Sequence, residues 1–304
     1  MSKRNTKVQS GSTVFYVPTT RVLPYFAIPF ILYLFACFIP VIGAVYYSLN
    51  NTFNFSFTYV GFGNYRKLLS DPIFWHSLKN NFIIMFVSAM FQFVPAVIIA
   101  SMMTTGIVKG KNFLQSMYFF PSIVSSIVIA NVWKVMFATR GGIINNLLIT
   151  MGLSAYTQNW LADPGIIMTT VSIPLAWQFI GYYLVIISSG ISNIDNSILE
   201  MATIDGATGY KRTIHIILPL IKNMLVVSLV ICISGSIKIF DQVYALTLGG
   251  PGYASSVLAM YAYNKSFVEG NFGYASSISV SMLVISFAMI IMLNVAKRMV
   301  RDDA

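Results

Sequence analysis

Long stretches of this chain carry no charged side chain. There is none between Arg21 and Arg66, and the apolar run from Val22 to Leu49 is long enough to cross a bilayer core of about 30 Å. Only 9% of the 304 residues are charged and 57% are hydrophobic, whereas a soluble globular domain has about 25% charged residues. The sequence therefore predicts an all-α integral membrane protein, because too few charges remain to cover a water-facing surface.

Six such runs predict six transmembrane helices. The first, residues 22–49, is too long for a signal-peptide core and is not followed by a small-residue cleavage site. The fifth lies between Lys222 and Lys238 and reaches full length only if it begins near Pro219 and ends near Asp241. The other four are residues 80–108, 112–133, 164–194 and 271–296.

Basic residues gather at the ends of the apolar runs, and their distribution predicts the orientation. Both termini are expected in the cytoplasm, because this arrangement places more Lys and Arg residues inside than in the external loops. The expected organisation is a cytoplasmic segment (1–21), a six-helix transmembrane domain (22–297) containing a long cytoplasmic loop (191–222), and a cytoplasmic tail (298–304).

Several classes of function are excluded by the same residues. The net charge of +10 is scattered rather than arranged in one stripe, so no nucleic-acid partner is expected. Cys37 and Cys232 lie in apolar runs, and His76 and His215 lack ligand-spaced partners, so no metal site and no catalytic residue is expected. Residues 106–111 are one residue short of a phosphate-binding loop and lack its Ser or Thr, so no ATP hydrolysis by this chain itself is expected.

The cytoplasmic loop 191–222 contains helix signals. Ser197 and Glu200 form a capping box, which predicts a short helix that starts at Ser197. Gly206 can end this helix, and a second short helix is expected from Tyr210 to Pro219. The spacing alone leaves two interpretations open: an ordinary interfacial hairpin or a compact protrusion that binds a partner.

The same loop resembles the "EAA" signature of the permease subunits of bacterial ABC importers. The matching stretches are Glu200-Met201-Ala202, Asp205-Gly206-Ala207 and Ile217-Leu218-Pro219, with Met201 where the family usually has alanine. In that family the segment is a coupling helix that docks in a cleft of the ATPase subunit. The resemblance implies a type I ABC importer permease fold and a coupling role for Glu200, Ala202, Asp205, Gly206, Ala207, Leu218 and Pro219.

Four further stretches narrow the resemblance to sugar permeases of the maltose and glycerol-phosphate type: Gly61 to Tyr65, Asp71 to Trp75, Leu246 to Pro251 and Phe272 to Ala275. The resemblance implies alternating-access import of a sugar across the bacterial cytoplasmic membrane. It also implies a heterodimer with a second, similar permease, two ATPase subunits that bind the ATP, and an extracytoplasmic sugar-binding protein. No cofactor is expected on this chain.

Polar residues within the spans are candidates for a substrate path, because such residues tend to face the interior of a helix bundle. By spacing, Ser122, Ser125 and Ser126 share one helix face, although serines also allow close helix packing. By resemblance, Ser122, Ser126, Gln178 and Ser236 occupy positions that line the substrate site of the maltose-type permease. Leu175 and Ile239 are apolar at two other such positions.

Aromatic and charged residues near the outer helix ends have two interpretations each. Trp177 and Tyr182 flank Gln178 and could present an aromatic face to a sugar, or they could anchor the helix at the outer interface. Lys238 and Asp241, three residues apart, are expected to form an ion pair, with contact to an acidic or phosphorylated substrate as the alternative.

Two other classes of protein compete with an ATP-driven importer. A secondary carrier driven by an ion gradient would need acidic residues within the membrane, and only Asp241 approaches that description. A membrane-embedded enzyme would need clustered acids, bases or metal ligands, and the sequence contains no such cluster.

Overall fold

The computed structural model describes residues 19–52, 56–103 and 108–302. Most of the predicted cytoplasmic segment 1–21, and Gly106 of the incomplete phosphate-binding loop, therefore lie outside the described residues. The chain divides into two units, residues 1–46 and 47–304. Each unit is described by itself.

The first unit is a continuous helical run. It consists of α1 (Thr19–Tyr33), a π-helical turn (Leu34–Phe38) and α2 (Ile39–Ser48), whose last two residues belong to the second unit. The stretch Pro24–Ser48 has a mean hydropathy of 2.4, and it is apolar around its whole circumference. A helix of this kind is suited to lipid or to the surface of another membrane helix.

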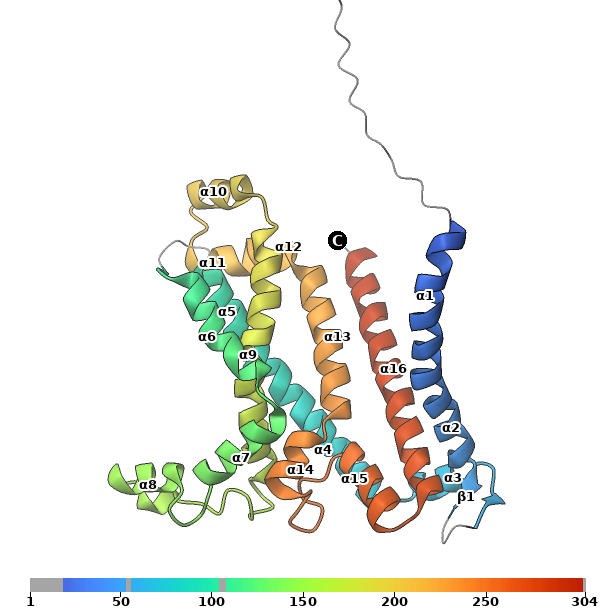
Figure 1. The fold of residues 1–304 in the computed structure, drawn as a ribbon. Coiled ribbons are helices and arrows are strands. Elements are labelled where there is room, and N and C mark those ends of the chain that lie inside the picture. The colour runs from blue at the N-terminus through green and yellow to red at the C-terminus, as the bar shows by residue number, and fades with distance from the viewer. Residues whose placement is uncertain (1–18, 53–55, 104–107, 303–304) are drawn as a thin grey trace, which may run out of the picture. The chain divides into compact units, whose positions relative to one another are not determined.

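The second unit contains three more helical runs that are long and apolar enough to cross a membrane, and two bent helix pairs (Figure 1). Counting each bent pair as one span gives six spans over the described residues, and counting only the straight runs gives four. The straight runs are α4 (Pro72–Ser88) continued by a π-helical turn (Ala89–Phe93) and α5 (Val94–Met103), α9 (Ile167–Ser192), and α16 (Phe272–Asp302). The bent pairs are α6 (Lys111–Ile123) with α7 (Ser126–Met136), and Gly209–Leu220 with α13 (Lys222–Lys238).

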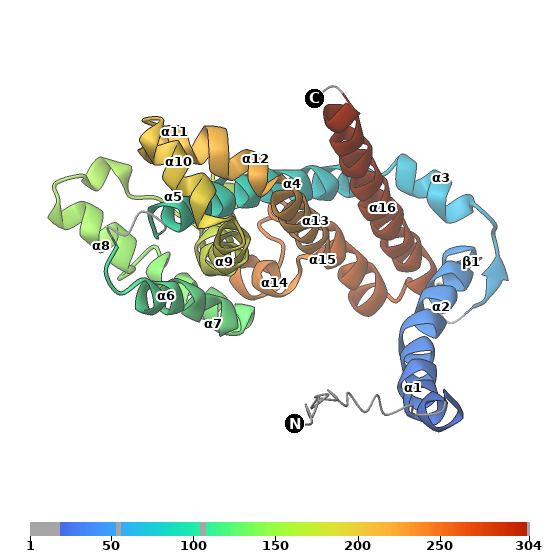
Figure 2. The same ribbon diagram turned by 90° about the horizontal axis from the view of Figure 1, so that it is seen from above.

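Shorter elements join the spans. Figure 1 shows α10 and α11–α12 at one end of this unit and α8, α14 and α15 at the opposite end, and Figure 2 gives the view along the helices. A single two-stranded antiparallel sheet pairs β1 (Asn50–Asn51) with β2 (Thr58–Tyr59) in the described residues. The remaining short elements are α3 (Gly63–Leu69), α8 (Ile143–Thr150), a 3-10 turn (Ser154–Tyr156), α10 (Asn196–Ile204), α11 (Gly209–Arg212), a π-helical turn (Thr213–Ile217), α12 (Leu218–Leu220), α14 (Asp241–Thr247), α15 (Leu258–Tyr263) and a π-helical turn (Asn264–Val268).

Several boundaries differ from those expected from the apolar runs. The second span begins at Pro72 rather than at residue 80, because Asp71 caps the helix and Pro72 occupies its first turn. In the fifth, the straight helix is only Lys222–Lys238, because the chain bends by 78° between Leu220 and Lys222 and leaves the helical conformation at Ile239, so the expected straight extension to Pro219 and Asp241 is wrong. The second helix of the loop, expected from Tyr210 to Pro219, extends from Gly209 to Leu220, so both ends lie within one residue of the expected positions.

Asn81, in the middle of α4, forms hydrogen bonds with three backbone groups that have no partner within their own helices, because they lie at helix ends. Its Nδ2 donates to the carbonyl oxygens of Ser236 (2.8 Å) and Ile237 (3.2 Å), next to the end of α13. Its Oδ1 accepts from the amide of Leu258 (2.9 Å), the first residue of α15. Because helix ends have unpaired carbonyl and amide groups, this single buried side chain holds both ends in place.

The Asp71 side chain links α4, α15 and α16 at the ends that are predicted to face the outside of the membrane. Its carboxylate accepts from the amide of Ile73 (2.9 Å), which caps α4, and from the hydroxyls of Tyr261 on α15 and Tyr274 on α16. Burial raises the pKa of the Asp71 carboxyl, but the hydrogen bonds from both tyrosines and from backbone amides outweigh this effect and hold the pKa below its usual value. The ionised carboxylate is therefore part of the folded structure.

We expect Asn81→Leu to destabilise the protein. The substitution keeps the approximate volume but leaves buried backbone groups of Ser236, Ile237 and Leu258 without their partner, at about 1–3 kcal/mol for each group left unsatisfied. The melting temperature in detergent should fall clearly. Asn131→Leu is the matched control, because the Asn131 amide is exposed and bonds only its own helix at Ile127; equal losses in both variants would contradict the role of Asn81.

We expect Asp71→Asn to destabilise the protein at neutral pH, with an effect that disappears in acid. A carboxyl whose folded pKa lies below the unfolded value of about 3.9 stabilises the fold above that value and loses this contribution as the pH falls through the folded pKa. The difference in melting temperature between wild type and variant should therefore be largest near pH 7 and shrink below about pH 4. A difference that does not change with pH would contradict this account.

Candidate functional site

A cavity of about 370 Å³ lies between α4, α7, α9 and the end of α13. Three of the residues predicted for a substrate path line it: Ser126 at the start of α7, Tyr182 on α9 and Ser236 on α13. Leu175 and Ile239, the two apolar departures from the maltose-type pattern, also lie in its wall. The cavity therefore combines hydroxyl groups and an aromatic ring with aliphatic surface.

The other three predicted path residues do not line this cavity. The Ser122 hydroxyl donates to the carbonyl oxygen of Phe119 (2.7 Å) within its own helix. Gln178 is 1% exposed, and its Nε2 donates to the carbonyl oxygen of Val124 (3.0 Å). Trp177 packs edge-on against Trp133, with ring centroids 6.0 Å apart, in an aromatic cluster. None of the three is therefore part of the cavity wall.

The expected shared face of Ser122, Ser125 and Ser126 is wrong, because the helix breaks between them. Val124 and Ser125 have extended backbone conformations, and α6 and α7 meet at 94°. The serines thus belong to two helices of different direction.

The side chain of Gln178, which lies on α9, stabilises the break between α6 and α7. Its amide bonds the Val124 carbonyl, which a continuing helix would have paired with a backbone amide. One turn further along α9, a Cβ atom at Gly181 would lie 1.9 Å from the carbonyl oxygen of Tyr118. Glycine is therefore required for the close approach of α9 to α6, and Gln178 reaches the break because the two helices are this close.

Two amide residues of the cavity wall were missed in the sequence. Gln92 is 3% exposed and donates to the carbonyl oxygen of Leu175 (2.9 Å), within the α9 span. Gln242 is fully buried in α14, and both polar atoms of its amide lack a hydrogen-bond partner within the described part of the chain. For Gln92, the available signal was an uncharged amide inside an apolar run, which is costly in a membrane and marks a site or a structural hydrogen bond. Gln242 directly follows Asp241, outside the six apolar runs, and carried no such signal.

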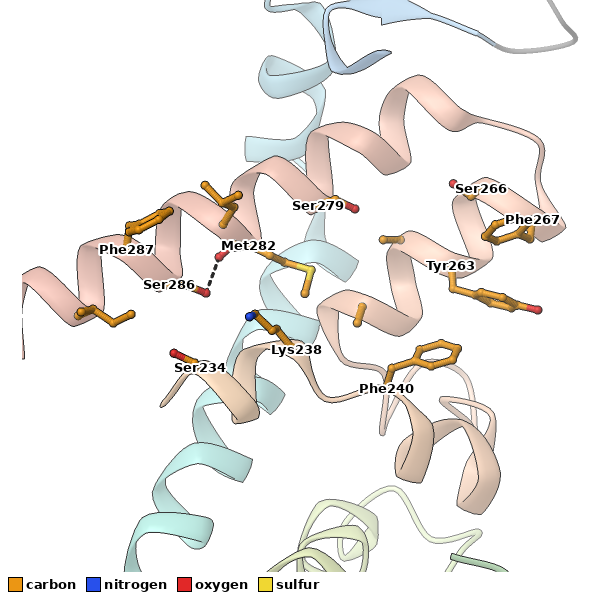
Figure 3. A pocket seen from close by; sticks show the side chains of 14 residues that line it. Ser234, Lys238, Phe240, Tyr263, Ser266, Phe267, Ser279, Met282, Ser286 and Phe287 are labelled. Carbon is orange, nitrogen blue, oxygen red and sulfur yellow. Dashed lines mark hydrogen bonds between the residues drawn. The ribbon is translucent and has the colours of Figure 1, made fainter. Parts of the chain in front are cut away.

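The expected ion pair between Lys238 and Asp241 is absent from the described residues, where the one salt bridge joins Lys265 and Glu269. Lys238 ends α13, and Asp241 begins α14 after two residues in non-helical conformations, so the helical spacing behind that prediction does not apply. Lys238 instead extends toward α16 in a second cavity of about 680 Å³ between α13, α15 and α16 (Figure 3). Asp241 lies in the wall of the smaller cavity, which Lys238 also borders.

The predicted coupling segment forms a protrusion at the end opposite to α8, α14 and α15 (Figure 1). The capping residue of α10 is Asp195 rather than the predicted Ser197, because the Asp195 carboxylate accepts from the amide of Ser197 (3.0 Å). The hydrogen bonds from the Ser197 backbone and side chain lower the pKa of the Asp195 carboxyl. The helix thus starts one residue before the expected position.

The end of α10 agrees with the predicted turn. Gly206 has a φ of +78°, a conformation that favours glycine. The Ala207 amide donates to the carbonyl oxygen of Ala202 (2.8 Å), so the chain closes back on the helix. Asp205, which follows the last helical residue, is exposed. Leu218 and Pro219 lie in the following helix, with Leu218 half-buried and Pro219 exposed.

The outer surface of α10 carries one carboxylate and two large apolar side chains. Glu200 is exposed, Met201 is 55% exposed and Ile204 is 84% exposed. Ala202 is the buried member of the helix, at 5% exposure. Exposed apolar side chains beside a charge, on a helix that protrudes from the helix bundle, are typical of a protein-binding surface.

The fold and these two sites define a helical membrane subunit with a cavity of mixed polar and apolar lining between its helices and a protruding helix. Residues 74–301 match the profile of the family described as "Binding-protein-dependent transport system inner membrane component". The chain belongs to this family of ABC transporter permeases. It is therefore a multi-pass protein of the inner membrane and a transporter subunit rather than an enzyme.

Similar proteins come from bacteria and archaea. The chain is 32% identical over 280 residues to "Probable ABC transporter permease protein YurN" of Bacillus subtilis (strain 168), covering 91% of this chain and 96% of that protein. It is 30% identical over 256 residues to the trehalose/maltose transport system permease protein MalF of Thermococcus litoralis, covering 83% of this chain and 85% of that protein. A chain of a bacterial ABC transporter involved in the import of alginate has a similar fold, with a TM-score of 0.80, 21% identity, and coverage of 92% of this chain and 96% of that chain.

These comparisons confirm the predicted all-helical permease fold and the predicted family. The roles of individual residues in the cavity and in α10 stay predictions. No group of three or more His, Cys, Asp or Glu side chains among the described residues is placed to hold a metal ion.

We expect Asp195→Ala to loosen the first turn of α10 more than Ser197→Ala does. The aspartate variant removes the acceptor for the Ser197 amide, whereas the serine variant leaves that acceptor in place. Hydrogen–deuterium exchange of the α10 amides should be faster in Asp195→Ala, and the change in Ser197→Ala should be smaller. Faster exchange in Ser197→Ala than in Asp195→Ala would contradict capping by Asp195 and support the capping box that was expected from the sequence.

Proposed function

We propose that this chain imports a sugar, with oligosaccharides as the favoured class, by alternating access driven by ATP hydrolysis in partner subunits. The observation that carries the proposal is the surface of α10, where Glu200 lies beside the exposed Met201 and Ile204. This helix would dock on an ATPase subunit, so that closure of two ATPase subunits moves the permease. Gly206 and the turn to Ala207 would keep α10 rigid enough to transmit that movement.

The sugar class is supported by the cavity and by the relatives. Sugars present hydroxyl rims and apolar ring faces, which suit the serines, amides and Tyr182 of the cavity wall. Related permeases are named for lactose and for trehalose and maltose. Ser126, Tyr182 and Ser236 would contact the sugar. Ser122, Trp177 and Gln178 would act at the border of the path, and Gln178 would do so by holding the helix break.

The partners in this proposal are a second, similar permease, two ATPase subunits and an extracytoplasmic sugar-binding protein. A fold relative was solved as an alginate transporter in complex with a periplasmic protein bound to alginate pentasaccharide, which supports the last of these. Both termini and the α10 end would lie in the cytoplasm, as the distribution of basic residues predicts. We propose the organisation that was predicted from the sequence: a cytoplasmic segment (1–21), a transmembrane domain (22–297) and a cytoplasmic tail (298–304).

The competing class from the sequence analysis, an ion-driven secondary carrier, does not agree with membership of the chain in the family of ABC transporter permeases. Such a carrier would use an acidic group near the cavity, and Asp241 is the acidic residue in the described cavity wall. Transport by the purified chain alone, driven by an ion gradient without ATP, would favour that class.

The coupling proposal predicts that Glu200→Ala uncouples the importer. In the assembled complex in liposomes, ATP hydrolysis stimulated by the binding protein, and sugar uptake, should each fall about tenfold or more, because docking would bury Glu200 against a basic partner, and removing one member of a buried, hydrogen-bonded charge pair costs about 2–5 kcal/mol. Glu269→Ala is the control, since its carboxylate pairs with Lys265 far from α10 in the chain. Undiminished ATP hydrolysis and sugar uptake in Glu200→Ala would contradict the role proposed for this residue.

A further inference from the structure

An apolar groove of about 590 Å³ lies at the α11–α12 end of the second unit, outside the cavity described above. One wall is formed by α5 and the π-helical turn before it, with Val97 and Ile98. Another is formed by the helical stretch Gly209–Leu220, with Ile214 and Leu218, and α13 completes the groove with Leu225 and Leu229. Ile98 is 52% exposed and Ile214 is 51% exposed, so the groove is open along its length.

The dimensions of the groove match one leaflet of a membrane. Its lining on the α4–α5 run extends from Ala89 to Met102, which corresponds to about 20 Å of helix at 1.5 Å per residue. Half of a hydrocarbon core of about 30 Å is about 15 Å. At the end of the groove, the helix Gly209–Leu220 is bent by 78° from α13. It therefore lies nearly parallel to the membrane plane if α13 crosses it.

The rim at this end of the groove is basic. Lys222 is exposed and shares a face of α13 with Leu225 and Leu229, at i, i+3 and i+7 spacing. Tyr210, in the groove lining, is 70% exposed and is followed by the exposed Lys211. The described helices that form the groove contain no Asp or Glu. No acidic side chain of these helices therefore competes for the lysines.

We propose that this groove binds an anionic glycerophospholipid, with one acyl chain between α5 and α13 and the headgroup along the helix Gly209–Leu220, which carries Lys211 and the Tyr210 hydroxyl near one end and is followed by Lys222 at the other. Basic pockets between membrane helices on the cytoplasmic side are suited to anionic headgroups, and each lysine near the surface adds about 1 kcal/mol, or about fivefold, in affinity. The inference rests on the proposed orientation, which assigns this end to the cytoplasmic leaflet. The bound lipid would brace α11–α12, the element that directly follows the α10 protrusion.

Native mass spectrometry of the complete importer complex tests the proposal. The complex is purified in detergent and titrated with phosphatidylglycerol or with phosphatidylcholine of the same acyl chains. We expect phosphatidylglycerol to bind more tightly, and Lys222→Gln to weaken its binding about fivefold, with a similar factor for Lys211→Gln. Ile98→Trp, which fills the groove from an exposed position, should reduce the binding of both lipids.

Two matched controls and one soluble competitor make the test specific. Lys109→Gln removes an exposed lysine that precedes α6, a helix that contributes no residue to the groove lining, and Ile123→Trp adds the same ring at an exposed position of α6; both should bind lipid as wild type does. Glycerol phosphate, which has the anion without acyl chains, should not displace the lipid. Equal binding of both lipids to wild type, or unchanged binding in Lys222→Gln and Ile98→Trp, would overturn the proposal. Lipid binding is measured without ATP or sugar, so a failure of the coupling proposal at Glu200 would leave this result interpretable.

Discussion

Buried side-chain amides hold the breaks in the membrane helices of this chain. A lipid environment supplies no water to bond the carbonyl and amide groups that a broken helix leaves free, so the protein must bond them itself. Asn81 does this for the end of α13 and the start of α15, and Gln178 does it for the end of α6. Without these hydrogen bonds, the breaks would be costly, and the arrangement of the half of the second unit that contains α7, α14 and α15 depends on them.

The cavity exists because the helices break where they do. If α13 continued past Lys238 as one helix, the segment from Ile239 to Gln242 would not form part of the cavity wall. If α6 continued past Ile123, Ser126 would lie on that helix instead of at the start of α7. Helices that continued straight through these two positions would therefore not bring Ser126, Ile239 and Gln242 together in one cavity wall.

The apolar runs were sufficient to predict the class of fold, because hydrophobic length depends on the membrane and not on the details of packing. They could not predict the direction of each run. The run from Asn112 to Trp133 has no charge at its break, and its 94° turn depends on Gln178 and Gly181, which lie on another helix. The cap at Asp195 was missed for a smaller reason. Ser197 with Glu200 and Asp195 with Ser197 are both local capping patterns, and only the backbone conformation decides between them.

The α4–α5 run shows how one helix can serve two surfaces of opposite character. The polar residues Ser88 and Gln92 line the cavity between α4, α7, α9 and α13, whereas Ala89, Phe93 and Val97 line the apolar groove. Neighbouring residues in the chain thus face different environments, because successive side chains of a helix point about 100° apart. A polar substitution at Val97 would place an unbonded group against lipid, while an apolar substitution at Gln92 would remove the bond to Leu175 from a wall that already contains aliphatic residues. The character of each face, rather than the average hydropathy of the span, therefore determines which substitutions this helix tolerates.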